Sequence, residues 1–132
     1  MKIFRQGYVN DAGIDLICEK KYVFEPMTTT IVQMEHKCTP LPGTCGMLVA
    51  RTSAAKKGLI ISMCPIDADY TGNLTAIVFN TSKHKIIYEK GQAFAQIVFI
   101  KLAIPPLHND EVEQLHEYYE KRGNNKLGST EC

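Results

Sequence analysis

The sequence predicts an all-β fold: a sandwich, a jelly roll or a barrel built from short strands. Its apolar segments are short and rich in Val, Ile, Phe and Tyr, and each is followed by a stretch of Gly, Pro, Asn or Ser. Such regular alternation of short strands and turns is typical of antiparallel β-proteins. The 132 residues are 45% hydrophobic, enough for one domain with its own core.

The expected strands follow one another along most of the chain. Turn sequences such as "PLPG", "DYTGN", "NTSKH" and "EKGQ" separate them. β-branched and aromatic residues dominate each segment, which favours a pleated and half-buried strand. The strands are predicted at residues 30–38, 45–50, 58–63, 74–79, 85–90 and 93–102.

Two segments have helical character. Residues 52–58, "TSAAKKG", combine a cap-like Thr and Ser with two alanines and a closing glycine, which predicts a helix of one or two turns. Residues 109–122 carry apolar positions at helical spacing. Because they follow "AIPP", an extended connection leaving the barrel is an equally good interpretation of that segment.

Composition and charge exclude several classes of protein. The net charge of +1 gives no reason to expect nucleic acid or an anionic membrane as a partner. The first residues lack the apolar core of a secretory signal, and no run is long enough to span a membrane. The five cysteines are scattered without zinc-site spacing. We therefore expect free thiols and an intracellular location, in the cytoplasm or nucleus.

Three internal segments place reactive side chains next to turns. "DAGIDL" carries Asp15 beside a glycine that allows close backbone approach, and "IDADY" places Asp67 next to an aromatic ring. "ARTSAAKKG" puts Arg51 directly before two hydroxyl residues at a helix start, which is a plausible phosphate cradle. The tail at 122–132 is either a disordered end or an arm that orders over an anion.

The order of these segments resembles the trimeric dUTPase family, which has five short motifs in a fixed order. "AGIDL", "ARTSAAKKG", "IDADYTGNL", "KGQAFAQIVF" and "RGNNKLGST" are similar to motifs one to five. The resemblance spans nearly the whole chain. It implies a distorted, jelly-roll-like β-barrel over residues 1–121, with 109–121 as a connecting segment, and a mobile C-terminal arm over residues 122–132.

The resemblance also implies the reaction. A family member hydrolyses dUTP to dUMP and pyrophosphate, which keeps uracil out of DNA and supplies dUMP for thymidylate synthesis. Asp67 matches the acid that polarises a water for attack on the α-phosphorus. Tyr70 matches the platform under the deoxyribose that leaves no room for a 2′-hydroxyl. Asp69 is then a hairpin residue without a catalytic role.

The same resemblance implies the binding residues, the metal and the assembly. Mg²⁺ is held mainly by the substrate phosphates, and Asp15 contacts it at most through water. The active sites are shared between the subunits of a homotrimer. The residues expected to bind substrate are Arg51, Thr52, Ser53 and Gln96 along the phosphates, Pro65, Ile66 and Tyr70 in the nucleoside hairpin, and Arg122, Leu127, Gly128, Ser129 and Thr130 in the arm.

The chain departs from the family pattern at several of these positions. Leu127 replaces a Phe that stacks on the base, and Pro65 removes a backbone donor beside the hairpin. Two alternative functions remain open. One is a dUTP-binding regulator without catalysis. The other is deamination, as in the related dCTP deaminases, which is disfavoured because Ile77 stands where those enzymes carry a catalytic Glu.

Overall fold

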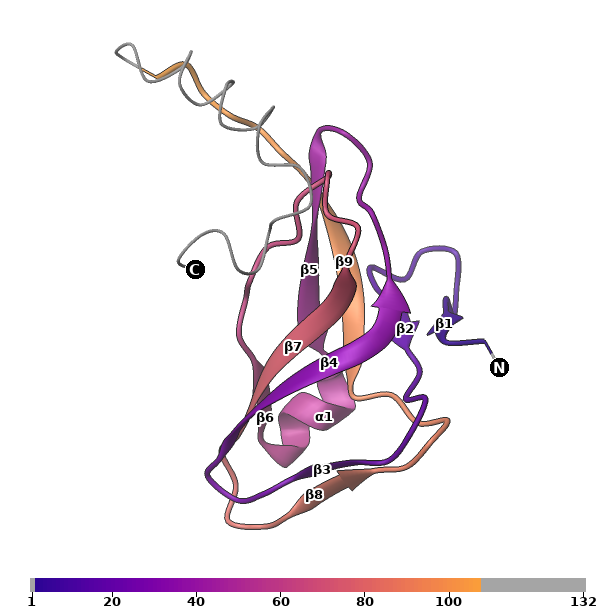
Figure 1. Cartoon of the computed structure of the whole chain (residues 1–132), viewed down its shortest axis with the longest axis vertical. Helices are drawn as coiled ribbons and strands as arrows, with labels where there is room; N and C mark the ends of the chain where they lie inside the picture. The colour runs from indigo at the N-terminus through magenta and orange to yellow at the C-terminus, as the bar shows by residue number, and fades with distance from the viewer. Residues whose placement is uncertain (1, 108–132) are drawn as a thin grey trace.

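The structure is a computed structural model that describes residues 2–107 of the chain. Strands dominate this part, which also contains one short helix (Figure 1). The all-β prediction is therefore confirmed. The predicted connecting segment at 109–121 and the predicted arm at 122–132 lie outside the described residues. Among residues 2–107, no helix has the length and apolarity needed to cross a membrane.

A four-stranded sheet has the strand order β1–β2–β9–β5, with antiparallel pairing throughout. The strand β9 (Ala95–Lys101) lies in its interior, with β5 (Thr44–Ala50) on one side and β2 (Ile14–Leu16) on the other. The short β1 (Phe4–Arg5) forms the outer edge beside β2. The β2 segment and the β9 segment thus lie side by side although Asp15 and its partner Gln96 are 81 positions apart in the sequence.

A second sheet has the order β4–β7–β6 and crosses in front of the first in Figure 1. Its central strand is β7 (Asn73–Asn80), flanked by β4 (Thr29–Lys37) and β6 (Leu59–Ile61). Side chains along β7 alternate between half-buried and fully buried positions, as expected when one face of a strand packs on the core. A two-stranded ribbon of β3 (Tyr22–Phe24) and β8 (Ile86–Tyr88) closes one end.

The core lies between these sheets and contains a cluster of aromatic rings around Phe94. The ring of Phe94 is fully buried and lies 5.1 to 5.8 Å, centroid to centroid, from the rings of Phe24, Tyr88 and Tyr22. Edge-to-face contacts of this kind add to the free energy gained by burying the rings. Phe94 directly precedes β9, so the cluster fixes the end of β9 that lies nearest to α1.

The helix α1 (Thr52–Lys57) joins β5 to β6 and corresponds to the predicted helix at 52–58. Gly58 ends the helix in the left-handed conformation, with φ of 110°. Its N–H donates to carbonyl groups in the last turn, as expected of a C-cap. The expectation that Thr52 and Ser53 cap the helix is wrong. Arg51 occupies the N-cap position, no side chain caps the helix, and both hydroxyl residues lie inside the first turn.

The six predicted strands are all present, with bounds that differ by at most two or three residues at each end. Three strands are missing from the sequence-based prediction, namely β1, β2 and β3. Each is only two or three residues long, too short to display an alternating pattern. Their pairing depends on neighbours that are distant along the chain, so local sequence gives little signal for them.

Candidate active site

A cleft of about 670 Å³ opens where β5 runs into α1, beside β2 and β9. Four of the predicted binding residues line it, together with the predicted metal contact. Its lining consists of Arg5, Gly7, Tyr8, Asp11, Ala12, Gly13, Asp15, Arg51, Thr52, Ser53, Lys56 and Gln96. We refer to this cavity as the phosphate cleft, because its hydroxyl and guanidinium groups are the kind that bind phosphate.

The register of the four-stranded sheet brings two of these residues together. Asp15 on β2 lies directly opposite Gln96 on β9, and Gln96 in turn lies opposite Val49 on β5. Residues directly opposite one another in an antiparallel pair project from the same face of the sheet. The Nε2 of Gln96 donates to the carbonyl of Ala50 at 3.4 Å, which turns the side chain toward the start of α1.

Asp15 holds Arg51 in the cleft through an ion pair. The Nε of Arg51 lies 3.1 Å from Oδ1 of Asp15. The backbone N–H of Arg51 also donates to the carbonyl of Phe94 at 2.9 Å, and its Nη1 donates to the carbonyl of Ala93 at 3.4 Å. Arg51 is thus held through both its backbone and its side chain. Because the guanidinium is already oriented, less conformational entropy is lost when it binds an anion.

The first turn of α1 presents two hydroxyl groups to the same cleft. Thr52 and Ser53 are both exposed and line the cleft, whereas the next residue, Ala54, is fully buried. Lys56 also lines the cleft, three residues after Ser53 and so on the same side of the helix. Burial of Ala54 therefore fixes the helix so that hydroxyl and ammonium groups face the cleft.

The hairpin that follows β6 carries the predicted catalytic acid. Ile66 exchanges two backbone hydrogen bonds with Gly46 on β5, at 2.8 and 2.9 Å, and its side chain is buried. Pro65, just before it, is exposed. The carbonyl of Asp67 accepts the N–H of Tyr70 at 3.1 Å, which closes a turn. Asp67 itself is half-buried.

Tyr70 forms the base of this hairpin. Its hydroxyl donates to the carbonyl of Asn73 at 2.6 Å, and its own carbonyl accepts the Thr39 hydroxyl at 2.8 Å. Only 8% of the residue is exposed. Within one chain, Tyr70 is therefore mostly part of the core.

Asp67 does not line the phosphate cleft. It lines a different pocket of about 300 Å³, together with Pro42, Gly43, Thr44, Ala68, Asp69, Leu102 and Ile104. This second pocket lies at the Thr44 end of β5, whereas Arg51 follows the opposite end of that strand. Gly46, which is bonded to Ile66, and Arg51 are five residues apart, or about 17 Å along an extended strand.

The described oxygen ligands can be compared with those that a magnesium ion prefers. Magnesium prefers oxygen ligands, keeps several waters and is commonly held through substrate phosphates. Within the described part of the chain, no three His, Cys, Asp or Glu side chains gather to hold a metal. Both carboxylate oxygens of Asp15 lie within 3.1 Å of guanidinium nitrogens. The carboxylate of Asp15 is therefore already engaged by two cationic side chains.

Three shifted pKa values lie outside the phosphate cleft. Burial, reinforced by the charge of Glu19, raises the pKa of the Cys18 thiol from its ordinary value of 9.0 to about 11. Burial also raises the pKa of Cys38. Burial and a hydrogen bond to Glu19 raise the pKa of Tyr22. These groups stay protonated at neutral pH and belong to the interior of the fold.

Several residues that line the phosphate cleft were not among the predicted site residues. Arg5, Gly7 and Tyr8 lie in the N-terminal segment, which matches no motif, and Lys56 was seen only as part of a helix. The sequence carries no motif that marks Arg5, because its pairing with β2 is visible only in the fold. The five predicted arm residues, Arg122, Leu127, Gly128, Ser129 and Thr130, lie outside the described residues.

Comparison with known proteins agrees with the fold. The dUTPase family model matches residues 1–130. The mouse deoxyuridine 5′-triphosphate nucleotidohydrolase is 32% identical over 126 residues, which cover 95% of this chain and 75% of the mouse protein. The dCTP deaminase of Pyrococcus horikoshii is 29% identical over 106 residues, which cover 80% of this chain and 68% of the deaminase.

Among solved structures, the native EIAV dUTPase matches with a TM-score of 0.72 and 28% sequence identity. The match covers 83% of this chain and 93% of that one. This likeness confirms the jelly-roll-like fold. The family match extends over nearly the full length of the sequence. The chain therefore belongs to the dUTPase family.

Proposed function

We propose that this protein hydrolyses dUTP to dUMP and pyrophosphate. The observation that carries the proposal is the phosphate cleft of this dUTPase-family chain. Residues from motifs one, two and four line this cleft, and their side chains include hydroxyl, amide and guanidinium groups. Arg51, Thr52, Ser53 and Gln96 supply donors suited to a chain of phosphate oxygens. The mouse relative is named for hydrolysis of deoxyuridine triphosphate, which supports the same substrate here.

In the proposed reaction, Asp67 accepts a proton from a water that attacks the α-phosphorus. The new bond joins the water oxygen to phosphorus, and the bond from the α-phosphorus to the α,β-bridging oxygen breaks. Pyrophosphate leaves with that electron pair, and dUMP retains the attacking oxygen. A positioned carboxylate of this kind accelerates the attack by about 100-fold or more.

Assembly into a homotrimer with shared sites accounts for the position of Asp67. Within one chain the acid opens onto a different pocket from that of Arg51, and the strand between them spans about 17 Å. Because Asp67 and Arg51 of one chain line different pockets, we expect the attacking water and the phosphate chain to meet where two subunits come together. We propose that Asp67 of one subunit faces the phosphate cleft of another, and that the arm residues at 122–132 complete this site.

Magnesium enters this proposal with the nucleotide. The dUTPase family generally uses Mg²⁺, and when bound to the phosphates the ion neutralises charge that builds on the leaving pyrophosphate. Asp15 serves chiefly to orient guanidinium groups and contacts the ion at most through water. The nucleoside is held by the hairpin at Pro65, Ile66 and Tyr70. A cytoplasmic or nuclear location fits the free thiols of the described cysteines.

Similarity to a dCTP deaminase makes deamination the second candidate. The side chain at position 77 decides against it. Ile77 lies half-buried on β7 opposite Ile31 of β4, in the place where those deaminases carry a catalytic Glu. A hydrocarbon side chain cannot transfer protons to a cytosine ring. We therefore favour hydrolysis of the triphosphate.

The first experiment is pyrophosphate release with Mg²⁺ present, comparing dUTP, dTTP, dCTP, dATP, dGTP and UTP. Turnover of dUTP alone would support the proposal. Turnover of dUTP together with dTTP or dCTP would mean that the altered hairpin reads the base loosely. Absence of turnover with every nucleotide would contradict catalysis and favour a dUTP-binding regulator.

Two matched variants test the role of the acid. Asp67→Asn should lower the rate by about 100-fold or more while nucleotide binding persists. Asp69→Asn changes a neighbouring acid in the same pocket and should keep the wild-type rate. Equal losses in both variants would contradict the assignment of Asp67.

Deletion of residues 122–132 tests the predicted arm. The deletion should slow hydrolysis, and an unchanged rate would mean that the arm is not part of the site.

A further inference from the structure

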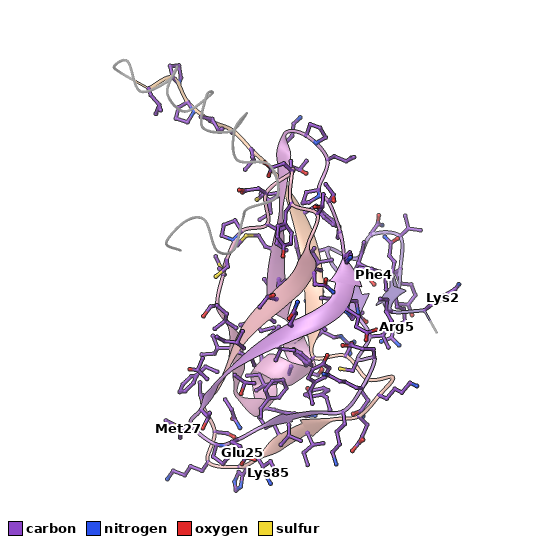
Figure 2. The ribbon with its side chains drawn as sticks, viewed as in Figure 1. Lys2, Phe4, Arg5, Glu25, Met27 and Lys85 are labelled. Atoms are coloured by element: carbon purple, nitrogen blue, oxygen red, sulfur yellow. The ribbon has the colours of Figure 1, made fainter. Side chains whose placement is uncertain are left out.

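The phosphate cleft contains a guanidinium that none of the five family motifs includes. Arg5 lies on β1, lines the cleft, and has about half of its side chain exposed. Figure 2 shows Arg5 beside Phe4 at the edge of the fold, well away from Glu25 and Lys85 at the β3–β8 end. The question is whether Arg5 merely pairs with an acid or has a role in binding.

The carboxylate of Asp15 holds Arg5 and Arg51 at once. Nη2 of Arg5 lies 3.0 Å from Oδ2, while Nε of Arg51 lies 3.1 Å from Oδ1. The Asp15 side chain is only 16% exposed, against 53% for Arg5 and 37% for Arg51. A mostly buried acid therefore orients two more exposed guanidinium groups, each of which keeps further N–H groups directed elsewhere.

The register of the sheet places Arg5 in line with the predicted phosphate ligands. Arg5 on β1 pairs with Asp15 on β2, and Asp15 pairs with Gln96 on β9. Because directly opposite residues share a face, all three side chains project from the same side of the sheet. That side is the one from which Gln96 lines the cleft.

The backbone of β1 is fixed although the strand is short. The carbonyl of Ile3 accepts hydrogen bonds from the N–H of Ile17 and from Nε2 of the buried His36, both at 2.8 Å. The ring of Phe4 meets the His36 ring edge-on, with centroids 5.2 Å apart. Arg5 thus follows an anchored segment and does not belong to a free terminus.

The charges around the cleft leave cationic groups available to a ligand. Three cationic side chains line it, those of Arg5, Arg51 and Lys56, against two acids. Each acid already has partners within the protein: Asp15 forms ion pairs with two guanidinium groups, and Asp11 accepts a hydrogen bond from the N–H of Tyr8 at 2.8 Å. A polyanion such as a triphosphate would supply the opposite charge.

We propose that Arg5 binds the phosphate chain of the nucleotide alongside Arg51, as a ligand supplied by the N-terminal strand. The proposal rests on the hydrolysis of dUTP proposed above. Asp15 acts in it as a positioning residue that aims both guanidinium groups. An exposed ion pair contributes little to stability by itself, so the benefit of this arrangement lies in preorganising two cations for one anion.

The test combines Arg5→Gln, Arg5→Lys and the control Lys85→Gln. Lys85 also pairs with a carboxylate, Nζ to Oε1 of Glu25 at 3.6 Å, and is similarly exposed, but it lies far from the cleft. Each variant is assayed for kcat and KM with dUTP, for binding of inorganic tripolyphosphate by calorimetry, and for its melting temperature. Calorimetry needs no turnover and therefore reports on the anion site alone.

Arg5→Gln should raise both KM for dUTP and Kd for tripolyphosphate by about 10-fold, the effect of losing one charge-assisted hydrogen bond. The value of kcat and the melting temperature should stay near those of the wild type. Arg5→Lys should fall between the two, because the charge remains while the planar fork is lost. Lys85→Gln should match the wild type throughout.

Unchanged KM and Kd in Arg5→Gln would overturn the proposal and leave Arg5 as a structural partner of Asp15. A lower melting temperature with unchanged Kd would overturn it as well. Failure of the proposed function looks different: the wild-type chain would bind tripolyphosphate in an Arg5-dependent way yet release no pyrophosphate from dUTP. That result would support the anion site and contradict the hydrolysis.

Discussion

Gly13 and Gln96 approach one another so closely that a side chain at position 13 would displace the side chain of Gln96. A β-carbon on Gly13 would lie 2.3 Å from Oε1 of Gln96 and 2.9 Å from its Cδ. The glycine of motif one is therefore needed for space, because it lets the motif-four glutamine lie against the backbone of the neighbouring segment. Position 13 and the orientation of Gln96 are coupled.

Gly13→Ala should displace the Gln96 side chain and lower kcat/KM for dUTP by about 10-fold, since a phosphate-side donor is lost. A double-mutant cycle measures whether the effect passes through Gln96. If it does, Gly13→Ala combined with Gln96→Ala will be no worse than Gln96→Ala alone. Additive losses would mean that the glycine matters for another reason.

Asp15→Asn should weaken substrate binding without weakening binding of magnesium. The amide cannot hold two guanidinium groups as the carboxylate does, so KM for dUTP should rise, while the free energy of unfolding should fall by less than about 1 kcal/mol. The Mg²⁺ concentration for half-maximal activity should stay within about threefold of the wild type. A shift of about 10-fold or more would make Asp15 a direct metal ligand.

Two substitutions at Tyr70 test the contribution of its hydroxyl hydrogen bond separately from that of its ring. Tyr70→Phe removes the bond to the Asn73 carbonyl and should cost about 1 kcal/mol of stability, while UTP remains a poor substrate. Tyr70→Leu removes the ring as well and should admit UTP. Thermal melting and the ratio of kcat/KM for dUTP and UTP measure both effects. Rejection of UTP by the Leu variant would contradict the proposed sugar platform.

Alkaline pH should destabilise the fold through Cys18. Its pKa rises from 9.0 to about 11 on folding, so the folded chain binds the thiol proton more tightly than the unfolded chain does. The stabilisation is complete below pH 9 and is lost between pH 9 and 11, with a slope of up to about 1.4 kcal/mol per pH unit.

Denaturant titrations at several pH values measure this slope. Cys18→Ala should flatten it, although Tyr22, whose pKa is also raised, keeps part of the dependence. A slope identical in Cys18→Ala and wild type would show that the thiol does not titrate in this range. Because the comparison uses slopes, the cost of the smaller side chain in the core does not affect it.

Local sequence was sufficient for the longer strands because β4, β5, β7 and β9 each combine β-branched residues with flanking turns. Local sequence was also sufficient for α1, because the alanines that favour the helix and the glycine that ends it, Gly58, lie close together in the sequence. It failed for β1, whose two residues are strand only because β2 lies beside them. Arg5 was missed for the same reason.

The assignment of Asp67 and Arg51 to one active site came from family motifs, not from local pattern. Motif order says which residues act together, but it says nothing about the distance between them in one chain. The roughly 17 Å of strand between Gly46 and Arg51 follows from the length of β5, but the pairing of Ile66 with Gly46, which sets the position of Asp67, is visible only in the fold.

The two separate pockets have a genetic consequence. In the proposed trimer, chains changed at Asp67 and chains changed at Arg51 would lack different parts of the shared site, so a mixed trimer would contain some sites in which both residues are intact. Alleles with changes at these positions should therefore complement one another when co-expressed, although each is inactive alone. Two changes within the phosphate cleft, such as those at Arg51 and Gln96, should not complement.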